Sequence, residues 1–407
     1  MKIVISTAGR WQLFALAREL EKRGHLERIY SGFIWSVLAR ESVPRAKVTT
    51  FPWFRTPYMA LGRLPFALPR RFARWLESMS CVAQDAYVAR HLPECDTFIG
   101  YDGAGLYTGK EAQRRGYVYI TDTGTSHVSF QRNLLREEFG SYGLEYPVEN
   151  EAIYRRQLEE YTQADAITVP STFAKDSFIC EGFPANRIHV TPYGVRTGHF
   201  SPVSEPPGDL FRIVFVGRLS IRKGARYLFE AFRDFSHPRK ELAIAGTISD
   251  EVRPLIASLG ELNVKFLGHV PNMALNQLYS SSHAFVLPSV EDGFGMVMAE
   301  AMACGCPVIA SMNTGAADLF TRGKEGFIVP VRDSRAIRDC LSRLADDPDL
   351  RTRMSAAAVE RVRSLGGWDA YGDKYVSLLS EMTNSRASRG GGTRALVPRS
   401  MHIGRIR

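Results

Sequence analysis

The sequence has no apolar run of about 18 residues, the length that a membrane-spanning helix needs. Hydrophobic residues still make up 45% of the 407 residues, enough for the cores of two or three domains. The six cysteines are scattered and suggest no disulfide framework, and Cys304-Gly305-Cys306 has no matching pair for zinc. The first residues contain no secretory h-region. Together these absences predict a reduced, cytoplasmic protein.

Two nucleotide and metal signatures are also missing. The loop after the first predicted strand, STAGRW, lacks Gly-x-Gly-x-x-Gly, which disfavours a dehydrogenase. The only Asp-x-Asp match of note, Asp347-Pro348-Asp349, lies in a predicted helix connection, so we expect no metal and no cofactor. Acidic residues are outnumbered, 43 against 52 Lys and Arg, and the net charge of +9 favours an anionic partner.

The pattern of strands and helices occurs twice along the chain. A short strand at 2–6 leads into a helix over Trp11–Lys22, and apolar runs at 96–101, 117–122, 165–171 and 187–194 predict further strands. After an irregular Pro/Gly segment, strands are predicted at 211–217, 241–246, 263–270, 283–289 and 306–311, with helices between them. We expect an α/β protein with two doubly wound, Rossmann-like domains whose parallel sheets face an inter-domain cleft.

The domain boundaries follow from these segments. We expect an N-terminal domain at 1–200, a linker at 201–210 and a second domain at 211–365. A C-terminal helix at 366–382 is expected to return to the N-terminal domain. The basic, Gly/Ser-rich tail at 383–407 is predicted to lack fixed structure.

Residues 33–76 form a basic, aromatic insertion in the predicted first domain. The segment holds seven Arg and one Lys against a single acid, Glu41. Its interleaved aromatics are Trp35, Phe51, Trp53, Phe54, Phe66, Phe72 and Trp75. Cations with large aromatics suit an anionic membrane surface, and the alternative is a helical excursion whose aromatics fill a core. No recognised nucleic-acid module accompanies the charge, so we expect no nucleic-acid partner.

The stretch Ser289–Ser311, SVEDGFGMVMAEAMACGCPVIAS, combines a glycine loop with one lone charge. Gly293 and Gly295 allow the backbone to approach a ligand, and a helix beginning near Met296 offers free N–H groups to an anion. Glu300 lies among apolar residues, where an unpaired carboxylate costs several kcal/mol. A vicinal diol such as ribose would partner it; the alternative is a backbone cap or an internal arginine.

Two cations are predicted at the carboxyl end of the first strand of the second domain. In VGRLSIRKG (216–224), Arg218 follows the strand and Lys223 precedes a helix. Both are expected to point to the crevice that holds Glu300, where they would neutralise a pyrophosphate leaving group. The alternative is a pair of solvated cations.

These segments together resemble a known family. VGRLSIRKGARYLFEAF (216–232), the region 266–311 and the region 164–202 are similar to a retaining glycosyltransferase of family 4 (glycosyl transferases group 1) with the GT-B fold, over about residues 1–380. The resemblance implies a hexosyltransferase-type enzyme of polysaccharide or glycolipid synthesis. It implies transfer from a nucleotide-diphosphate sugar to a glycan or lipid-linked acceptor, with retention of configuration. The lack of a convincing Asp-x-Asp site adds the expectation that no metal is needed. The protein would be cytoplasmic, peripheral on the inner face of the membrane.

The resemblance also implies roles for residues. Asp292 and the glycine loop would hold the sugar, Glu300 the ribose, and the backbone at Met296 and Val297 the phosphates, while the base would lie near Val270. The implied donor-binding set is Gly217, Val270, Glu291, Gly293, Phe294, Gly295, Met296, Val297 and Glu300. Arg218 and Lys223 would stabilise the leaving pyrophosphate.

One position departs from the family pattern. The family usually has Glu directly before Gly-Phe-Gly, where this chain has Asp292 with Glu291 just ahead of it. Register favours Asp292 as the working carboxylate. The alternatives are that Glu291 reaches in, or that activity is reduced and the protein only binds a sugar nucleotide. A sugar-nucleotide epimerase and a sugar phosphorylase are further candidates.

The first domain supplies weaker candidates. His127 follows a predicted strand in TDTGTSHVSFQR, and the family often places a His near the donor sugar in the corresponding segment. The alternative for a lone His is a structural role. Gly9 and Arg10 lie in the first strand–helix loop, where they would contact the acceptor or a phosphate.

Overall fold

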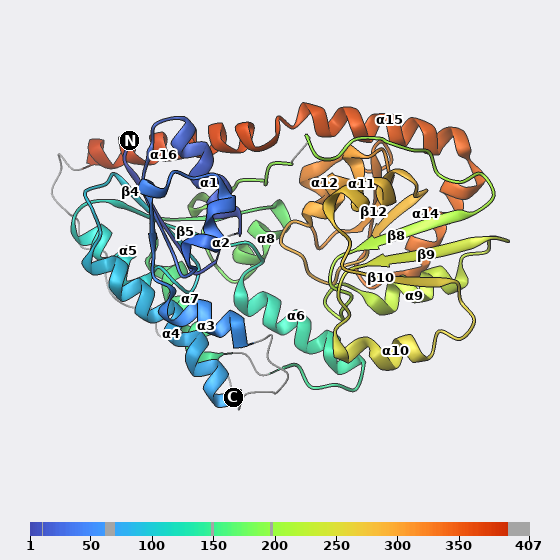
Figure 1. Cartoon of the computed structure of the whole chain (residues 1–407), viewed down its shortest axis with the longest axis horizontal. Helices are drawn as coiled ribbons and strands as arrows, with labels where there is room; N and C mark the ends of the chain where they lie inside the picture. Colours follow the sequence, from blue (N-terminus) through green and yellow to red (C-terminus); the bar gives the residue numbers. More distant parts are fainter. Residues whose placement is uncertain (10, 62–69, 148–149, 196–197, 390–407) are drawn as a thin grey trace.

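The computed structural model describes residues 1–9, 11–61, 70–147, 150–195 and 198–389, which form two α/β domains side by side (Figure 1). Each domain has one parallel sheet with helices on both faces, so the predicted fold class is confirmed. Strands such as Ile3–Thr7 are buried along their whole length, as expected for sheets covered on both sides.

The first sheet has seven parallel strands in the order β3-β2-β1-β4-β5-β6-β7. Their bounds are β1 Ile3–Thr7, β2 Leu26–Ser31, β3 Val48–Thr50, β4 Thr97–Tyr101, β5 Val118–Asp122, β6 Ala166–Val169 and β7 Ile188–Val190. The order reverses between β1 and β4, so the loops after these two strands diverge and leave a crevice at their carboxyl ends.

The second sheet has six parallel strands in the order β10-β9-β8-β11-β12-β13. Their bounds are β8 Phe211–Val216, β9 Lys240–Ala245, β10 Val264–Gly268, β11 Ala284–Leu287, β12 Val308–Ser311 and β13 Gly326–Val329. Here the reversal lies between β8 and β11, the strands that precede the VGRLSIRKG and EDGFG loops. Both loops therefore lie at the same point of the sheet.

The helices of the first domain are α1 Trp11–Lys22, α2 Trp35–Leu38, α3 Pro52–Leu61, α4 Arg70–Arg90, α5 Leu106–Arg114, α6 Val128–Ser141, α7 Glu151–Gln163 and α8 Thr172–Cys180. Those of the second half are α9 Ala225–Asp234, α10 Arg253–Ala257, α11 Asn272–Ser280, α12 Met296–Ala303, α13 Ala316–Leu319, α14 Ser334–Asp346, α15 Pro348–Ser364 and α16 Gly367–Arg389.

The last helix, α16, lies on the first domain although it follows the second domain in sequence (Figure 1). Tyr371, Tyr375 and Leu379 are buried in the core beside β1 and α1. The Tyr375 hydroxyl donates to Asp122 Oδ1, 2.5 Å away, at the end of β5. The two domains are therefore joined both through residues 198–210 and through the α15–α16 connection.

Helix α6 extends from the first domain to the second (Figure 1). Leu135 and Phe139 are buried in the core of the second domain. Glu138 between them is fully buried, and it accepts hydrogen bonds from the Tyr227 hydroxyl at 2.8 Å and from Arg332 Nε at 2.6 Å. This contact holds the domains together on the side opposite α16.

Two boundaries need correction. The segment 33–76 is not simply an insertion, because Val48–Thr50 is a strand that pairs with β2 at the edge of the first sheet. The tail is helical further than expected: α16 continues to Arg389, and the ion pair of Arg386 with Asp165, at 2.8 Å, anchors that end. Residues 390–407 lie outside the described residues.

Candidate active site

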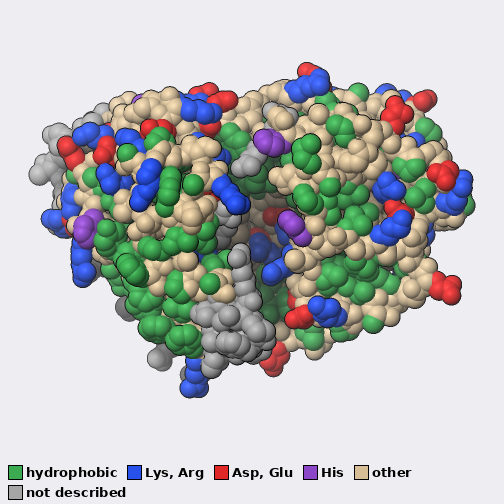
Figure 2. Space-filling model, viewed as in Figure 1, with side chains coloured by type: hydrophobic (Ala, Val, Ile, Leu, Met, Phe, Trp, Pro, Cys, Tyr) green, Lys and Arg blue, Asp and Glu red, His purple; other side chains and the backbone are tan. Residues whose placement is uncertain are grey.

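A cavity of about 540 Å³ lies between the two domains. It opens in the hollow between the lobes in Figure 2. The first domain and the C-terminal crossing contribute Gly9, Gln12, Ala15, Arg18, Phe33, Glu41, Arg55, Met59, Tyr193, Gly194, Val195 and Trp368. The second half contributes Phe200, Asn272, Phe294, Met296, Ala299 and Glu300. Of the residues expected at a ligand site, Gly9, Phe294, Met296 and Glu300 therefore line one cavity.

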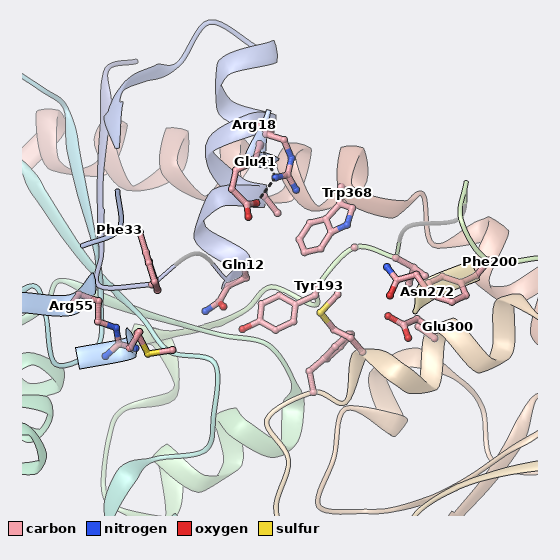
Figure 3. Close-up of a pocket in the computed structure, with 18 residues that line it drawn as sticks. Gln12, Arg18, Phe33, Glu41, Arg55, Tyr193, Phe200, Asn272, Glu300 and Trp368 are labelled. Carbon is pink, nitrogen blue, oxygen red and sulfur yellow. Dashed lines mark hydrogen bonds and ion pairs between the residues drawn. The ribbon is translucent and has the colours of Figure 1, made fainter. Parts of the chain in front are cut away.

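One face of α12 forms the wall of this cavity. Met296, Ala299 and Glu300 share that face because they are three and four residues apart, while Met298, Ala301 and Met302 are buried in the domain core. Glu300 is half-buried, and Oε2 accepts a hydrogen bond from the Tyr279 hydroxyl at 3.2 Å. The lone carboxylate is thus not sealed in the helix interior, but faces the cavity with a protein donor beside it (Figure 3).

Helix α12 begins in the way that the glycine loop predicts. Gly295 is its N-cap, with φ of 77°, a left-handed conformation that a side chain would strain. The backbone N–H groups at Met296 and Val297 are the first of the helix, and they are the donors that an anion would use.

Lys223 and Asp292 meet beside this helix start. The Lys223 ammonium donates a hydrogen bond to Asp292 Oδ2, and both side chains are mostly buried. Burial alone would raise the pKa of Asp292, but the charge and hydrogen bond of Lys223, together with Arg222, outweigh it and hold the pKa below its ordinary value. Asp292 is therefore ionised at neutral pH.

Glu291 is not a cavity residue, which corrects its expected place in the donor set. Its side chain is fully buried, and Arg222 lies 2.6 Å from Oε2. Oε1 accepts from the Ser126 hydroxyl of the first domain at 2.8 Å. The two adjacent acids point to different sides of the loop, and only Asp292 lies beside Lys223.

Gly293 is pressed against the first domain. A Cβ at this position would lie 2.1 Å from the carbonyl oxygen of Gly124, so only glycine fits. The carbonyl oxygen of Gly293 also accepts a hydrogen bond from the Ser171 hydroxyl at 2.6 Å. The backbone of this loop therefore contacts protein across the domain boundary.

The other expected donor residues lie outside the cavity wall. Arg218 is exposed and forms no hydrogen bond or ion pair with the part of the chain that is described, and Gly217 before it has φ of 135°. Val270 is half-buried between β10 and α11. Arg10 lies outside the described residues.

His127 does not line the cavity. The residue is 2% exposed, and its ring lies among Tyr161, Phe178 and Phe183 at centroid distances of 5.1, 4.8 and 5.4 Å. Its Nδ1 accepts the backbone N–H of Ser129 at 3.2 Å, so His127 caps the first turn of α6. Burial lowers the pKa of this imidazole to about 4, which keeps the ring neutral. The structural alternative fits these contacts better than a catalytic role.

Several cavity residues were not anticipated. Figure 3 shows Tyr193 and Gln12 pointing toward one another in the middle of the cavity, with Trp368 above them. Tyr193 contacts both domains, because its ring centroid lies 5.2 Å from that of Phe294 and 6.4 Å from that of Trp368. Only their positions in the sequence could have indicated a place in the cavity. Tyr193 follows β7, and Trp368 lies at the start of α16, the helix that returns to the first domain.

Two further properties concern metal and membrane. Within the described ranges, no group of three or more His, Cys, Asp or Glu side chains is arranged to hold a metal ion. None of the helices described is long and apolar enough to cross a membrane.

Comparison with known proteins identifies the part of the chain that carries α12. Residues 199–361 match the family model described as Glycosyl transferases group 1. The second domain belongs to the glycosyl transferases group 1. Among solved structures, sucrose-phosphate synthase from Thermosynechococcus elongatus has a TM-score of 0.70 at 20% identity and covers 95% of this chain and 100% of its own. HepE of Anabaena, in complex with UDP-glucose, has a TM-score of 0.68 at 18% identity, over 94% and 100%. The whole chain therefore has the GT-B fold.

The chain is also similar to curated glycosyltransferase and synthase sequences. The D-inositol 3-phosphate glycosyltransferase of Corynebacterium jeikeium is 30% identical over 229 residues, 50% of this chain and 54% of that protein. The mannosylfructose-phosphate synthase of Agrobacterium fabrum is 25% identical over 252 residues, 56% of each. The chain thus spans about half the length of the curated relatives that it matches.

The burial of His127 predicts a specific pH dependence. The unfolded chain binds a proton near pH 6.5, whereas the folded ring does so only near 4, so the stabilising effect is complete above pH 6.5 and is lost as the pH falls toward 4. Between pH 7 and 5 the wild type should lose about 2 kcal/mol more unfolding free energy than His127→Asn, which keeps a capping acceptor but does not titrate.

Urea denaturation of both proteins at the two pH values measures this difference. Equal losses for wild type and variant would mean that the ring is solvated or already protonated in the folded state.

Proposed function

We propose that the protein is a retaining glycosyltransferase that moves a sugar from a nucleotide-diphosphate sugar to a glycan or lipid-linked acceptor in polysaccharide or glycolipid synthesis. The observation that carries the proposal is the α12 wall of the inter-domain cavity. A carboxylate, Glu300, faces the cavity one turn beyond a glycine-capped helix start. A diol and a phosphate separated by about one helical turn match a nucleoside diphosphate.

The donor is proposed to lie along α12. Glu300 would accept hydrogen bonds from both ribose hydroxyls. These bonds would replace the one from the Tyr279 hydroxyl or be made beside it. The N–H groups of Met296 and Val297 would donate to the diphosphate, and the base would lie toward Val270. HepE of Anabaena was solved with UDP-glucose, which supports a nucleotide-sugar donor in a fold of this kind.

The chemistry is proposed to need no nucleophilic side chain. The acceptor hydroxyl attacks on the face that the diphosphate leaves, and a leaving phosphate oxygen takes its proton. Arg218 is exposed at the end of β8 and would pair with the departing charge. Lys223 would share its charge between the diphosphate and Asp292, whose carboxylate would hold a sugar hydroxyl. Since the chain's own cations supply this stabilisation, we propose a metal-independent reaction.

Other enzymes built on the GT-B fold, and a sensor that only binds, are the competing functions. Incubation with UDP-, GDP- and ADP-sugars separates them. Slow hydrolysis of one donor, or transfer to added acceptors, supports a glycosyltransferase. An epimerised donor supports an epimerase, phosphate-dependent sugar transfer supports a phosphorylase, and binding without turnover supports a sensor.

Glu300→Gln should weaken donor binding, because the amide keeps the size of the side chain but loses the charge and one acceptor. The expected loss is about 1.5–3 kcal/mol of binding free energy, the range for a charged hydrogen bond. Calorimetric titration with the donor that the wild type turns over measures it.

The matched control is Glu261→Gln, an exposed carboxylate of the same domain. Glu300 would be a structural residue only if the folded Glu300→Gln variant binds the donor as tightly as the control.

Arg218→Ala should lower kcat by about 100-fold, because one charge contact to the leaving group is lost in the transition state. EDTA should leave the wild-type rate unchanged. Initial-rate measurements with and without chelator test both statements. Loss of activity in EDTA that Mn²⁺ restores would overturn the metal-independent mechanism.

The acceptor is proposed to be reached from an anionic membrane surface. Helices α3 and α4 carry four large apolar side chains in the open: Trp53 is 73% exposed, Trp75 51%, Met59 46% and Phe72 45%. Figure 2 shows hydrophobic side chains gathered at the lower left, over the region of these helices. Arg55 and Met59 of α3 also line the cavity. One helix thus links the exposed surface to the site, as a lipid-linked acceptor requires.

Not every aromatic residue of the segment is available to lipid. The ring of Phe51 stacks on Tyr87 at 5.0 Å and that of Phe54 contacts Trp75 at 6.5 Å. The exposed set and the nearby Arg71 and Arg74 are therefore the proposed contact.

Replacement of Trp53 and Trp75 by Ala should release the protein from liposomes that contain phosphatidylglycerol, since each removes a large exposed ring from the interface. Co-sedimentation at low salt measures binding. The control is Met273→Ala, which removes an apolar side chain that is 80% exposed on the second domain. Wild-type protein that stays in the supernatant would remove the membrane proposal.

A further inference from the structure

The two loops that carry Lys223 and Asp292 are joined by a second, parallel ion pair. Arg222 precedes Lys223, Glu291 precedes Asp292, and Arg222 lies 2.6 Å from Glu291 Oε2. The backbones are joined as well, because the carbonyl oxygen of Arg222 accepts the N–H of Val290 at 2.9 Å. A displacement of Glu291 therefore moves Asp292 relative to Lys223.

The other carboxylate oxygen of Glu291 forms hydrogen bonds across the domain boundary. Glu291 Oε1 accepts the hydroxyl of Ser126 at 2.8 Å and its backbone N–H at 3.3 Å. Ser126 lies in the loop between β5 and α6 of the first domain, and both residues are fully buried. A carboxylate closed off from water needs all of these donors. Separating the domains removes two of them.

We propose that Glu291 is a positioning residue that couples closure of the domains to the geometry of the Lys223–Asp292 pair. Closure brings Ser126 onto Oε1, which fixes the carboxylate against Arg222 and so fixes the loop on which Asp292 lies. The inference rests on the proposed function for the role of Asp292, but the coupling itself is a property of the protein without ligand. Glu291 touches neither donor nor acceptor in this scheme.

A neighbouring contact supports the assignment. The Ser171 hydroxyl of the first domain donates to the carbonyl oxygen of Gly293 at 2.6 Å, two residues after Glu291. The same short loop is thus held from the first domain on both sides of Asp292. Closure therefore acts on this loop directly.

A second cross-domain contact, which lies nearer the surface, provides a comparison. Thr172 donates its hydroxyl to Asp318 Oδ1 at 2.6 Å and its N–H to Oδ2 at 2.9 Å. This contact resembles that of Ser126 with Glu291, because in each case one residue donates its hydroxyl and its backbone N–H to a single carboxylate. Asp318 lies in α13, and it does not contact the Lys223–Asp292 pair.

Ser126→Ala and Thr172→Ala are the variants to compare. With the donor that the wild type uses, Ser126→Ala should lower kcat by about 10-fold, the effect of losing one hydrogen bond to a charged group. Binding of the nucleoside diphosphate alone, taken from UDP, GDP and ADP by calorimetry, should stay within about 2-fold, because the nucleotide contacts the second domain. Thr172→Ala should leave both values near those of the wild type.

Hydrogen exchange of ligand-free protein gives a readout that needs no activity. The peptide over residues 288–296 should exchange faster in Ser126→Ala than in the wild type, and at the wild-type rate in Thr172→Ala. Equal effects of the two variants, in exchange or in kcat, would mean that the Ser126 contact only helps to hold the domains together, and would overturn the proposal. A wild-type protein without turnover would refute the proposed function, while the exchange comparison would still decide the coupling.

Discussion

A carboxylate buried between two domains has to find its partners in both, and Glu291 does so. Arg222 of the second domain meets one oxygen and Ser126 of the first domain meets the other. An unpaired charge at this depth would cost several kcal/mol, so the contact constrains how the domains sit. Burial alone would lower the pKa of Arg222, but the charges of Glu291 and Asp292 raise it. In the same arrangement Gly293 approaches Gly124 so closely that a Cβ on Gly293 would lie 2.1 Å from the Gly124 carbonyl oxygen.

Hydrophobic pattern and glycine placement predict most of the fold. Ten of the strands follow from apolar runs, and both α1 and α12 begin where their sequences indicate. β2, β3 and β13 were missed because LERIYS carries charges and VTT and GFIV are short. The packing of α6 against the second domain could not be predicted either. Leu135 and Phe139 have ordinary helical spacing, which says that one face is buried but not which domain covers it.

The candidate site also has a part that the sequence predicts and a part that it does not. The loop and helix of the GFG segment predict the place of Glu300, because a helix that starts at the end of a strand orients its own side chains. The roles of Glu291 and His127 depend on residues far away in sequence: Ser126 for the first, and Tyr161, Phe178 and Phe183 for the second. The position of a residue in a loop or strand predicts which way its side chain points, but not which residues from distant segments it contacts. Trp368 enters the cavity because the chain crosses back along α16, whereas Tyr193 enters it from the segment that follows β7.

In the proposed reaction, charge would decide how the cations divide the chemistry. Arg222 and Lys223 pair with Glu291 and Asp292, so two positive charges are balanced by two negative ones, and the exposed Arg218 leaves one positive charge in excess. Arg222 is committed to Glu291, and Lys223 is engaged by Asp292. The proposed diphosphate would carry more negative charge than this excess balances, so the helix start at Gly295 would have to contribute. In this proposal Arg218, which is exposed and forms no ion pair with the residues described, would be the cation that follows the leaving group. Lys223 would act mainly by keeping Asp292 ionised and in place.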